Sequence, residues 1–521
     1  MFSKQIQFLL ILSISTQFAN GSRILMVTLA GTKSHKIPFL ELGKGLSERG
    51  HNVTFINAFP TENPMSSIHE INPTNLVLYI KNFTNWDLLG PKLRGEMPVP
   101  IIDAFKFGYQ VCEAFLSDRE TKILMRRRIY NLIILDGAYP ECAVGLAYHF
   151  RVPFIYINTV GFYTGSLSEA GNPTPYSITP YLGLPFSDNM HLLQRLINSA
   201  YHLCLSLLHS VMVRYFLHQV LKMHINPNIP NPYEISKNVS LIFQNGHFSL
   251  TYPRPFLPSV IEIACIHCRP AKSLPKDLEH FINAGNGKGF VYVSMGSSVK
   301  ASNMPEELRM LFISVFRSLP YQVLWKWEMT SMNHNFQLPD NVMLSNWFPQ
   351  QDLLGHPKIK AFVTHGGLLS LFETVYHGVP VVAMPVFCDH DSNVEKAIRD
   401  GYAIRLELQE LTATKLLKSI SAVISEPKYK HNALKRSLLL KDQMEPPITR
   451  AIFWTEYVIR HNGGYHLQSP SKDMTFIRYY LIDVIFTTIV CIYFAIYFFY
   501  GLCKLSNKLF FCNYNVKLKI N

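Results

Sequence analysis

A histidine and an aspartate follow two apolar runs in the first third of the chain. His35 lies in the loop after the run 23–31, and Asp136 closes the run 131–136. Read as parallel strands, these runs would bring both side chains to one edge of a sheet, facing a cleft. A carboxylate beside a histidine orients the imidazole and stabilises the imidazolium. The pair therefore has the chemistry of a general base, His35, supported by Asp136.

A second group of candidate residues lies in the segment 346–393. Its centre is a strand-like run, 360–364, followed by His365-Gly366-Gly367 and a helical stretch. Glycines let the backbone approach a ligand closely, and the free N–H groups at the positive end of a helix bind phosphate. His365 can donate a hydrogen bond to a phosphate oxygen there. Taken alone, this tripeptide before a helix is a weak signal.

Alternating short strands and helices surround both groups. In the first half, strands are expected at 23–31, 52–58, 131–136 and 153–158, with helices at 38–49 and 142–150. In the second half, strands are expected at 289–296, 322–327, 342–347, 359–365 and 379–385, with helices at 306–317 and 368–376. This pattern predicts an α/β protein with two Rossmann-like, doubly wound lobes and a cleft at the carboxyl ends of their strands. The sequence has no dinucleotide fingerprint after the first strand and no P-loop motif, which argues against nicotinamide enzymes and P-loop ATPases.

A proline-rich passage separates the two halves, from Tyr252 to Pro275, and a glycine-rich stretch follows at 285–289. Such runs cannot continue a helix or lie inside a sheet, so we take the passage as a linker. The predicted divisions are a first lobe at 22–270, a second lobe at 271–440, and a helical return with a juxtamembrane segment at 441–478.

Both ends of the chain carry apolar segments with simple interpretations. Residues 1–21 have one lysine, an apolar core and small closing residues, as a signal peptide does. Residues 479–503 are long and apolar enough to span a membrane, and the tail 504–521 contains lysines but no acidic residue. We therefore expect a single-pass type I protein with a large lumenal part. Lys517 and Lys519 resemble the dilysine signal of endoplasmic reticulum membrane proteins.

Charge and cysteine content exclude some classes of function. The net charge of +13 is spread along the chain, without the basic stripe and interleaved aromatics of a nucleic-acid-binding protein. Cys265 and Cys268 form a lone CxxC, which indicates a structural role or one disulfide rather than a zinc site. Three sequons are candidates for N-glycosylation in a lumenal chain, at Asn52, Asn82 and Asn238.

A leucine-rich amphipathic region with several histidines spans 190–225. Ordinary helical packing is the first interpretation of this region. The alternative is that part of it lines an apolar ligand pocket or contacts the bilayer.

The whole segment 346–393 resembles the signature of the UDP-glycosyltransferase family that includes the glucuronosyltransferases. The matching features are W-x-P-Q at 347–350, the H-G-G with a glutamate eight residues after the histidine, and an aspartate after a G-x-P strand. The resemblance extends from about Arg23 through the terminal span. It implies the two-lobed GT-B fold, with acceptor bound by the first lobe and UDP-sugar by the second. It also implies a small lipophilic acceptor and a single displacement with inversion, using His35 and Asp136.

Carried over by position, the resemblance assigns a role to each residue of the donor site. Uracil would be contacted by Trp347 and Gln350, ribose by Glu373, the diphosphate by Ser297, His365, Gly367 and Ser370, and the sugar by Asp389 and His390. The diphosphate would be neutralised by helix ends and histidine, so that no metal is needed.

Two departures from the family pattern bear on the donor. Leu368 and Leu369 replace a small residue and an asparagine, so phosphate contacts there would come from backbone N–H groups or Ser370. His390 replaces the usual glutamine, which leaves glucose, the expected sugar, in competition with glucuronate and galactose. Two alternatives are a catalytically silent family member and a dedicated ceramide or sterol glycosyltransferase. The sequence leaves homo- or hetero-oligomerisation open.

Overall fold

The computed structural model describes residues 21–518 except 30–31, 63, 84–85, 128, 160–164, 182, 286 and 329–336. It divides into two compact units, Met1–Gln468 and Ser469–Asn521. The predicted signal peptide, apart from Gly21, lies outside the described residues, as does Lys519 of the predicted dilysine signal.

The first lobe is built on a parallel sheet that has seven strands among the described residues, in the order β3-β2-β1-β4-β5-β6-β7. The strands are β1 (Arg23–Thr28), β2 (Asn52–Asn57), β3 (Ile68–Ile71), β4 (Leu132–Asp136), β5 (Phe154–Asn158), β6 (Leu241–Gln244) and β7 (Val260–Glu262). The central strands β4, β5 and β6 are buried along their whole length, as continuous apolar runs predict for a parallel sheet covered on both faces.

The linker prediction for 252–275 is partly wrong, because β7 lies within this passage. The strand occupies a proline-free stretch at the edge of the sheet, where it pairs only with β6 among the described strands. The prolines lie on either side of this strand, so each strand residue keeps its backbone N–H donor.

Helices cover both faces of the first sheet. They are α2 (Lys36–Glu48), α3 (Thr74–Phe83), α4 (Leu89–Leu93), α5 (Ile101–Ser117), α6 (Arg119–Arg127), α7 (Val144–Phe150), α8 (Gly165–Glu169), α9 (Leu192–Val211), η1 (Met212–Leu217), α10 (His218–His224) and α11 (Pro232–Ser236). A disulfide joins Cys112 of α5 to Cys142, just before α7. Near the end of the unit, α19 (Pro447–Arg460) returns to this lobe and packs Ala451 and Val458 against the core that contains Ile24.

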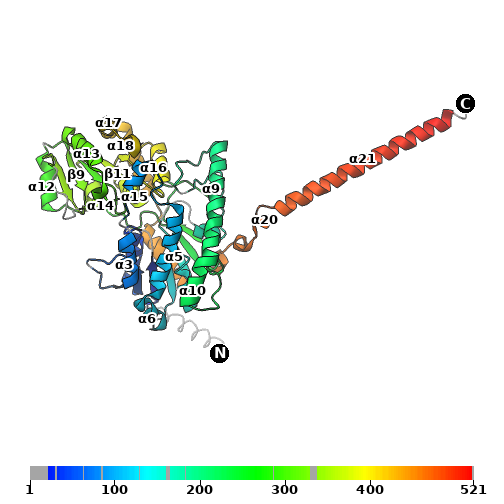
Figure 1. Ribbon diagram of the computed structural model, residues 1–521, viewed down its shortest axis with the longest axis horizontal. Coiled ribbons are helices and arrows are strands. Elements are labelled where there is room, and N and C mark those ends of the chain that lie inside the picture. Colours follow the sequence, from blue (N-terminus) through cyan, green and yellow to red (C-terminus); the bar gives the residue numbers. More distant parts are fainter. Residues whose placement is uncertain are drawn as a thin grey trace, which may run out of the picture. The chain divides into compact units, whose positions relative to one another are not determined.

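The second lobe has a parallel sheet with six described strands in the order β10-β9-β8-β11-β12-β13. These are β8 (Phe290–Ser294), β9 (Gln322–Lys326), β10 (Val342–Ser345), β11 (Ile359–Thr364), β12 (Val381–Ala383) and β13 (Ala403–Arg405). Its helices are α12 (Lys276–Ala284), α13 (Glu306–Ser318), α14 (Gln350–Leu354), α15 (Leu368–His377), α16 (His390–Arg399), α17 (Ala413–Ser425) and α18 (Pro427–Lys441). Figure 1 shows the helices of the lobes as two groups, with α3, α5 and α6 in one and α12, α13 and α17 in the other.

The described part of the second unit contains the 3-10 helix η5 (Pro470–Asp473) and the α-helices α20 (Phe476–Tyr479) and α21 (Ile482–Leu518). Leu481 separates the two α-helices with a left-handed φ of 55°. The stretch Ile482–Lys508 is long and apolar enough to cross a membrane, and α21 continues into the predicted tail. Within the described chain, Leu192–His224 of the first unit meets the same criteria of length and composition.

Candidate active site

The His35 and Asp136 side chains meet at the carboxyl edge of the first sheet. Strands β1 and β4 are parallel neighbours, so the residues that follow them lie side by side. His35 stands immediately before α2, and Asp136 is the last residue of β4. The distance from His35 Nδ1 to Asp136 Oδ2 is 3.0 Å. The structure thus brings together the two residues that the sequence predicts at this edge.

Thr159 is a third member of this group that the sequence analysis missed. It follows β5, the strand next to β4. Its hydroxyl lies 2.7 Å from His35 Nδ1 and donates a 3.2 Å hydrogen bond to Asp136 Oδ1. Asn245 Nδ2 holds the Thr159 carbonyl oxygen at 3.0 Å. The rule that carboxyl ends of parallel strands share an edge would have singled out this residue.

The pKa of His35 is raised above its ordinary value. Burial alone lowers this pKa, but the charge and hydrogen bond of Asp136, with the charge of Asp389, outweigh it. Asp389 belongs to the second lobe, so the charged groups of both lobes act on the imidazole. Since Nδ1 is engaged by Asp136 and Thr159, Nε2 is the nitrogen that remains for proton transfer.

One cavity of about 1620 Å³ is lined by residues of both lobes. His35 lines it from the first lobe, and Asp136 lies behind His35 outside the lining. Every predicted donor-site residue lines it from the second lobe: Ser297, Trp347, Gln350, His365, Gly367, Ser370, Glu373, Asp389 and His390. The structure therefore gathers residues that span nearly a hundred positions of the sequence into one cavity with the His35 pair.

The ring of His365 lies between Gly296 and Gly367, and a side chain at either position would collide with it. A Cβ on Gly296, which has a φ of 79°, would overlap the imidazole, and a Cβ on Gly367 would lie 2.6 Å from Nε2. Helix α15 begins directly after Gly367, and a glycine cannot cap it with a side chain. Its first N–H groups are therefore available to an anion that enters beside His365.

The expectation that a histidine helps to neutralise the diphosphate needs correction. Burial and the charge of Lys326 lower the pKa of His365 to about 3, so its ring is neutral at physiological pH. His365 can still donate a hydrogen bond, but the positive charge beside it belongs to Lys326, which the sequence analysis missed. Lys326 ends β9, lines the cavity and donates hydrogen bonds to the Gly296 carbonyl at 2.9 Å and Glu328 at 2.6 Å.

The residues predicted to bind the nucleoside are linked to one another. Gln350 Nε2 donates to Glu373 Oε2 at 2.6 Å and to Ser370 Oγ at 3.1 Å. The buried His267 lies 3.3 Å from the other Glu373 oxygen. Trp347 is 60% exposed although it lines a cavity, and Lys33 Nζ of the first lobe lies 5.0 Å from its ring centroid. An exposed indole face of this kind offers a planar base a stacking surface.

Asp389 and His390 stand at the start of α16. Asp389 Oδ2 accepts a 2.8 Å hydrogen bond from Asn393, whose amide nitrogen also donates to the Gly366 carbonyl. The ring of His390 packs edge-on against His365, with centroids 4.4 Å apart. Burial holds the pKa of His390 well below its ordinary value. Its Nδ1 accepts a 3.4 Å hydrogen bond from the Phe387 N–H, so Nε2 carries the proton and is left as a donor.

Helix α9 does not show the ordinary packing expected for the leucine-rich region. Its buried side chains are the polar Asn198 and His202, whose amide and ring bond to carbonyls of the 176–179 segment. Tyr201 and Leu205 line the cavity, which agrees with the alternative interpretation. Most of the leucines are exposed: Leu192, Leu193, Leu196, Leu203, Leu207 and Leu208.

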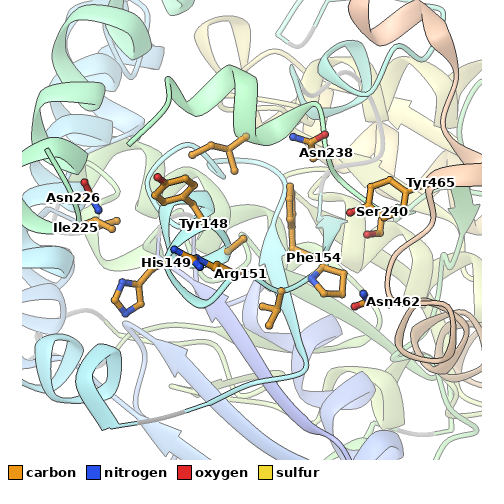
Figure 2. Close-up of a pocket in the computed structure, with 14 residues that line it drawn as sticks. Tyr148, His149, Arg151, Phe154, Ile225, Asn226, Asn238, Ser240, Asn462 and Tyr465 are labelled. Atoms are coloured by element: carbon orange, nitrogen blue, oxygen red, sulfur yellow. The ribbon is translucent and has the colours of Figure 1, made fainter. Parts of the chain in front are cut away.

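A second pocket, of about 520 Å³, lies at the amino ends of β5 and β6, whereas His35 lies at the carboxyl edge. Figure 2 shows Arg151, Phe154 and Tyr465 around it, with Asn238 beside them. Among the described residues that line this pocket, none belongs to the predicted catalytic or donor site. Asn238 is exposed, as are the other glycosylation candidates, Asn52 and Asn82.

A family model described as "UDP-glucoronosyl and UDP-glucosyl transferase" matches residues 91–517. The chain belongs to this family. As a UDP-glycosyltransferase it has the two facing Rossmann-like lobes of the GT-B fold, and it is a hexosyltransferase by the activities that its relatives are named for.

Relatives of this UDP-glycosyltransferase are named for three different sugars. UDP-glucosyltransferase 2 of Dactylopius coccus is 30% identical over 92% of each chain. UDP-glucuronosyltransferase 2C1 of Oryctolagus cuniculus is 32% identical, over 91% of this chain and 98% of the relative. The human 2-hydroxyacylsphingosine 1-beta-galactosyltransferase is 31% identical, over 93% and 88%.

Solved glycosyltransferases share the fold of this UDP-glycosyltransferase. The kitacinnamycin glycotransferase has a TM-score of 0.59 and 17% identity, covering 84% of this chain and 100% of its own. VinC, solved with dTDP, has a TM-score of 0.55 and 17% identity over 85% and 100%.

Proposed function

We propose that this enzyme transfers a hexose, most simply glucose, from a UDP-sugar to a hydroxyl of a small lipophilic acceptor, with inversion. The observation that carries the proposal is the single cavity in which the His35 pair faces the nine donor-site residues. Much of the first-lobe lining is apolar, including Phe105, Val111, Leu205 and Met212, which suits an acceptor of low polarity.

In the proposed step, His35 Nε2 removes the proton of the acceptor hydroxyl. The oxygen forms a bond to the anomeric carbon as the bond from that carbon to the UDP oxygen breaks. Asp136 stabilises the imidazolium that results. The leaving diphosphate carries the negative charge, which the N–H groups of α15, Ser297 and Lys326 are placed to stabilise.

Two other readings compete with this proposal. A dedicated lipid glycosyltransferase is supported by the similarity to a sphingolipid galactosyltransferase and by the size of the cavity. A catalytically silent protein is disfavoured, because His35 lines the cavity and is hydrogen-bonded to Asp136. Incubating the enzyme with ceramide, a sterol and simple phenols, and measuring glycoside formation, separates the three readings.

Changing His390 to glutamine is expected to alter the choice of sugar. His390 presents one N–H where glutamine would present both a donor and an acceptor, so the hydroxyl pattern that fits best should change. We expect the ratio of kcat/KM for UDP-glucose and UDP-galactose to shift by about tenfold or more. The measurement is product formation with UDP-glucose, UDP-galactose, UDP-glucuronate and UDP-N-acetylglucosamine. His431→Gln, at an exposed position of α18, is the control; equal ratios in all three proteins would exclude His390 from sugar selection.

We also propose that the first unit lies in the lumen of the endoplasmic reticulum and that α21 anchors it. Support comes from the apolar stretch Ile482–Lys508, the lysines that follow it, and two disulfides among the described cysteines. Asn82→Gln and Asn238→Gln should each remove one glycan that endoglycosidase H cleaves. A chain with no such glycan would contradict the lumenal placement.

The exposed leucines of α9 favour contact with the bilayer surface. Residues 189–233 contain no aspartate or glutamate but include Arg195, Arg214 and Lys222, a composition that suits anionic lipid headgroups. A chain ending at Gln468 should therefore float with vesicles of phosphatidylcholine and phosphatidylserine. Serine in place of Leu193, Leu196 and Leu207 should abolish flotation; equal flotation of both proteins would refute the contact.

A further inference from the structure

The first-lobe end of the large cavity, where an acceptor is proposed to bind, contains ionisable side chains that the transfer step does not use. Glu141, Glu169, His209 and Tyr233 line the same cavity as His35. Glu141 precedes Cys142, whose disulfide to Cys112 ties this segment to α5. The position of Glu141, in the loop that follows Asp136, is therefore fixed covalently to α5.

His209 and Glu141 form an internal ion pair within this cluster. Glu141 is 7% exposed, and its carboxylate lies 2.9 Å from His209 Nε2. Nδ1 of the same ring lies 2.8 Å from the Tyr233 hydroxyl. Burial lowers the pKa of His209, but the charge and hydrogen bond of Glu141 more than offset this, so that the pKa is raised. The ring of His209 is thus engaged by Glu141 on one side and by Tyr233 on the other.

Glu169 is the second carboxylate; the charge of His209 acts on it too, but the 2.9 Å contact of that ring is with Glu141. The Glu169 Oε2 atom is buried and has no hydrogen-bond partner among the described residues. Burial and the charge of Glu141 raise its pKa to about 7, against the weaker effects of His209 and Ser236. The exposed Arg214 contacts other groups: its guanidinium lies 5.4 Å from the Tyr233 ring and its Nε donates to Ser210.

Tyrosine rings line the same cavity. They are Tyr139, Tyr176, Tyr181 and Tyr201, and the centroids of Tyr181 and Tyr201 lie 6.0 Å apart. Aromatic faces together with a carboxylate are the groups that bind an ammonium ion in proteins.

We propose that this end of the cavity is a subsite for a protonated amine of the acceptor, with Glu169 as its counter-ion. The favoured acceptors are then lipophilic alcohols or phenols that carry a basic amine away from the reacting hydroxyl. Calling the bound molecule an acceptor rests on the proposed function, whereas the affinity for an amine does not.

The test measures binding rather than turnover, so that it stands apart from transferase activity. Two ligands are compared by calorimetry on the detergent-solubilised full chain: a 4-alkylphenol and a phenol of the same length whose alkyl chain ends in a dimethylamino group. Glu169→Gln keeps the size of the side chain and removes its charge. We expect it to weaken binding of the amine at least tenfold and to change binding of the neutral phenol less than twofold.

Glu96→Gln is the matched control, because Glu96 also lines the cavity but pairs with Arg94 at 2.7 Å. It should leave the affinities for both ligands unchanged. Equal weakening of both ligands by Glu169→Gln, or unchanged binding of the amine, would overturn the subsite. Selective weakening in an enzyme that transfers no sugar would uphold the subsite and count against the proposed function alone.

Discussion

Replacing His35 with alanine should lower kcat/KM for sugar transfer by about 10²–10⁴-fold, the range that general-base catalysis contributes. His35 lines the cavity with Nδ1 already bonded, which leaves Nε2 to take the acceptor proton. The substitution should leave UDP affinity nearly unchanged, since the residues predicted to bind UDP belong to the other lobe. Transfer is followed as glycoside formation, and UDP affinity by calorimetry.

His69→Ala is a suitable control for this experiment, because His69 is exposed on β3 and does not line the cavity. Its transfer rate should equal that of the wild type. Full transfer by a folded His35→Ala enzyme that still binds UDP would remove His35 from the mechanism.

Replacing Asp136 with asparagine should also lower kcat/KM by about 10²–10⁴-fold, because the imidazolium then loses its stabilising charge. The charge and hydrogen bond of Asp136 raise the pKa of His35, so their removal lowers it. Only the neutral imidazole accepts a proton, and activity is lost as the pH falls through this pKa. The acidic limb of the pH profile of kcat/KM should therefore move to lower pH in the variant, while the plateau drops.

A matched control is Asp103→Asn, at a half-exposed position of α5 where the carboxylate pairs with Lys106. It should reproduce the wild-type plateau and limb. An acidic limb that stays in place or moves to higher pH in Asp136→Asn would show that Asp136 does not set the pKa of His35.

The sequence predicts those strands that are continuous apolar runs, because a parallel sheet buries both faces of such strands. β1, β4 and β8 are examples. β7 and β13 have three residues each, and the linker prediction failed at β7 because the prolines around it were taken to exclude a strand. The packing prediction for α9 failed differently, because periodicity identifies a helix but does not say whether its apolar face meets a core.

In the candidate site, too, some residues could be predicted from the sequence and others could not. His35 and Asp136 could be placed together because each follows a recognisable strand, and the resemblance assigned the donor residues position by position. Thr159 follows the predicted strand 153–158 and could have been singled out by its place at the same edge, but its role, like the roles of Lys326 and Glu169, could not be read from spacing. Their significance depends on what surrounds them: the His35 pair for Thr159, His365 for Lys326, and a buried, unpartnered oxygen for Glu169.

The anomeric configuration of the product tests the central claim most directly. A UDP-sugar with an α-linkage and a ¹³C label at the anomeric carbon would be incubated with the enzyme and a simple phenol, and the glycoside examined by NMR. A single displacement driven by His35 predicts only the β-glycoside from the wild type. An α-glycoside, or β-glycoside formed equally well by His35→Ala, would contradict the account.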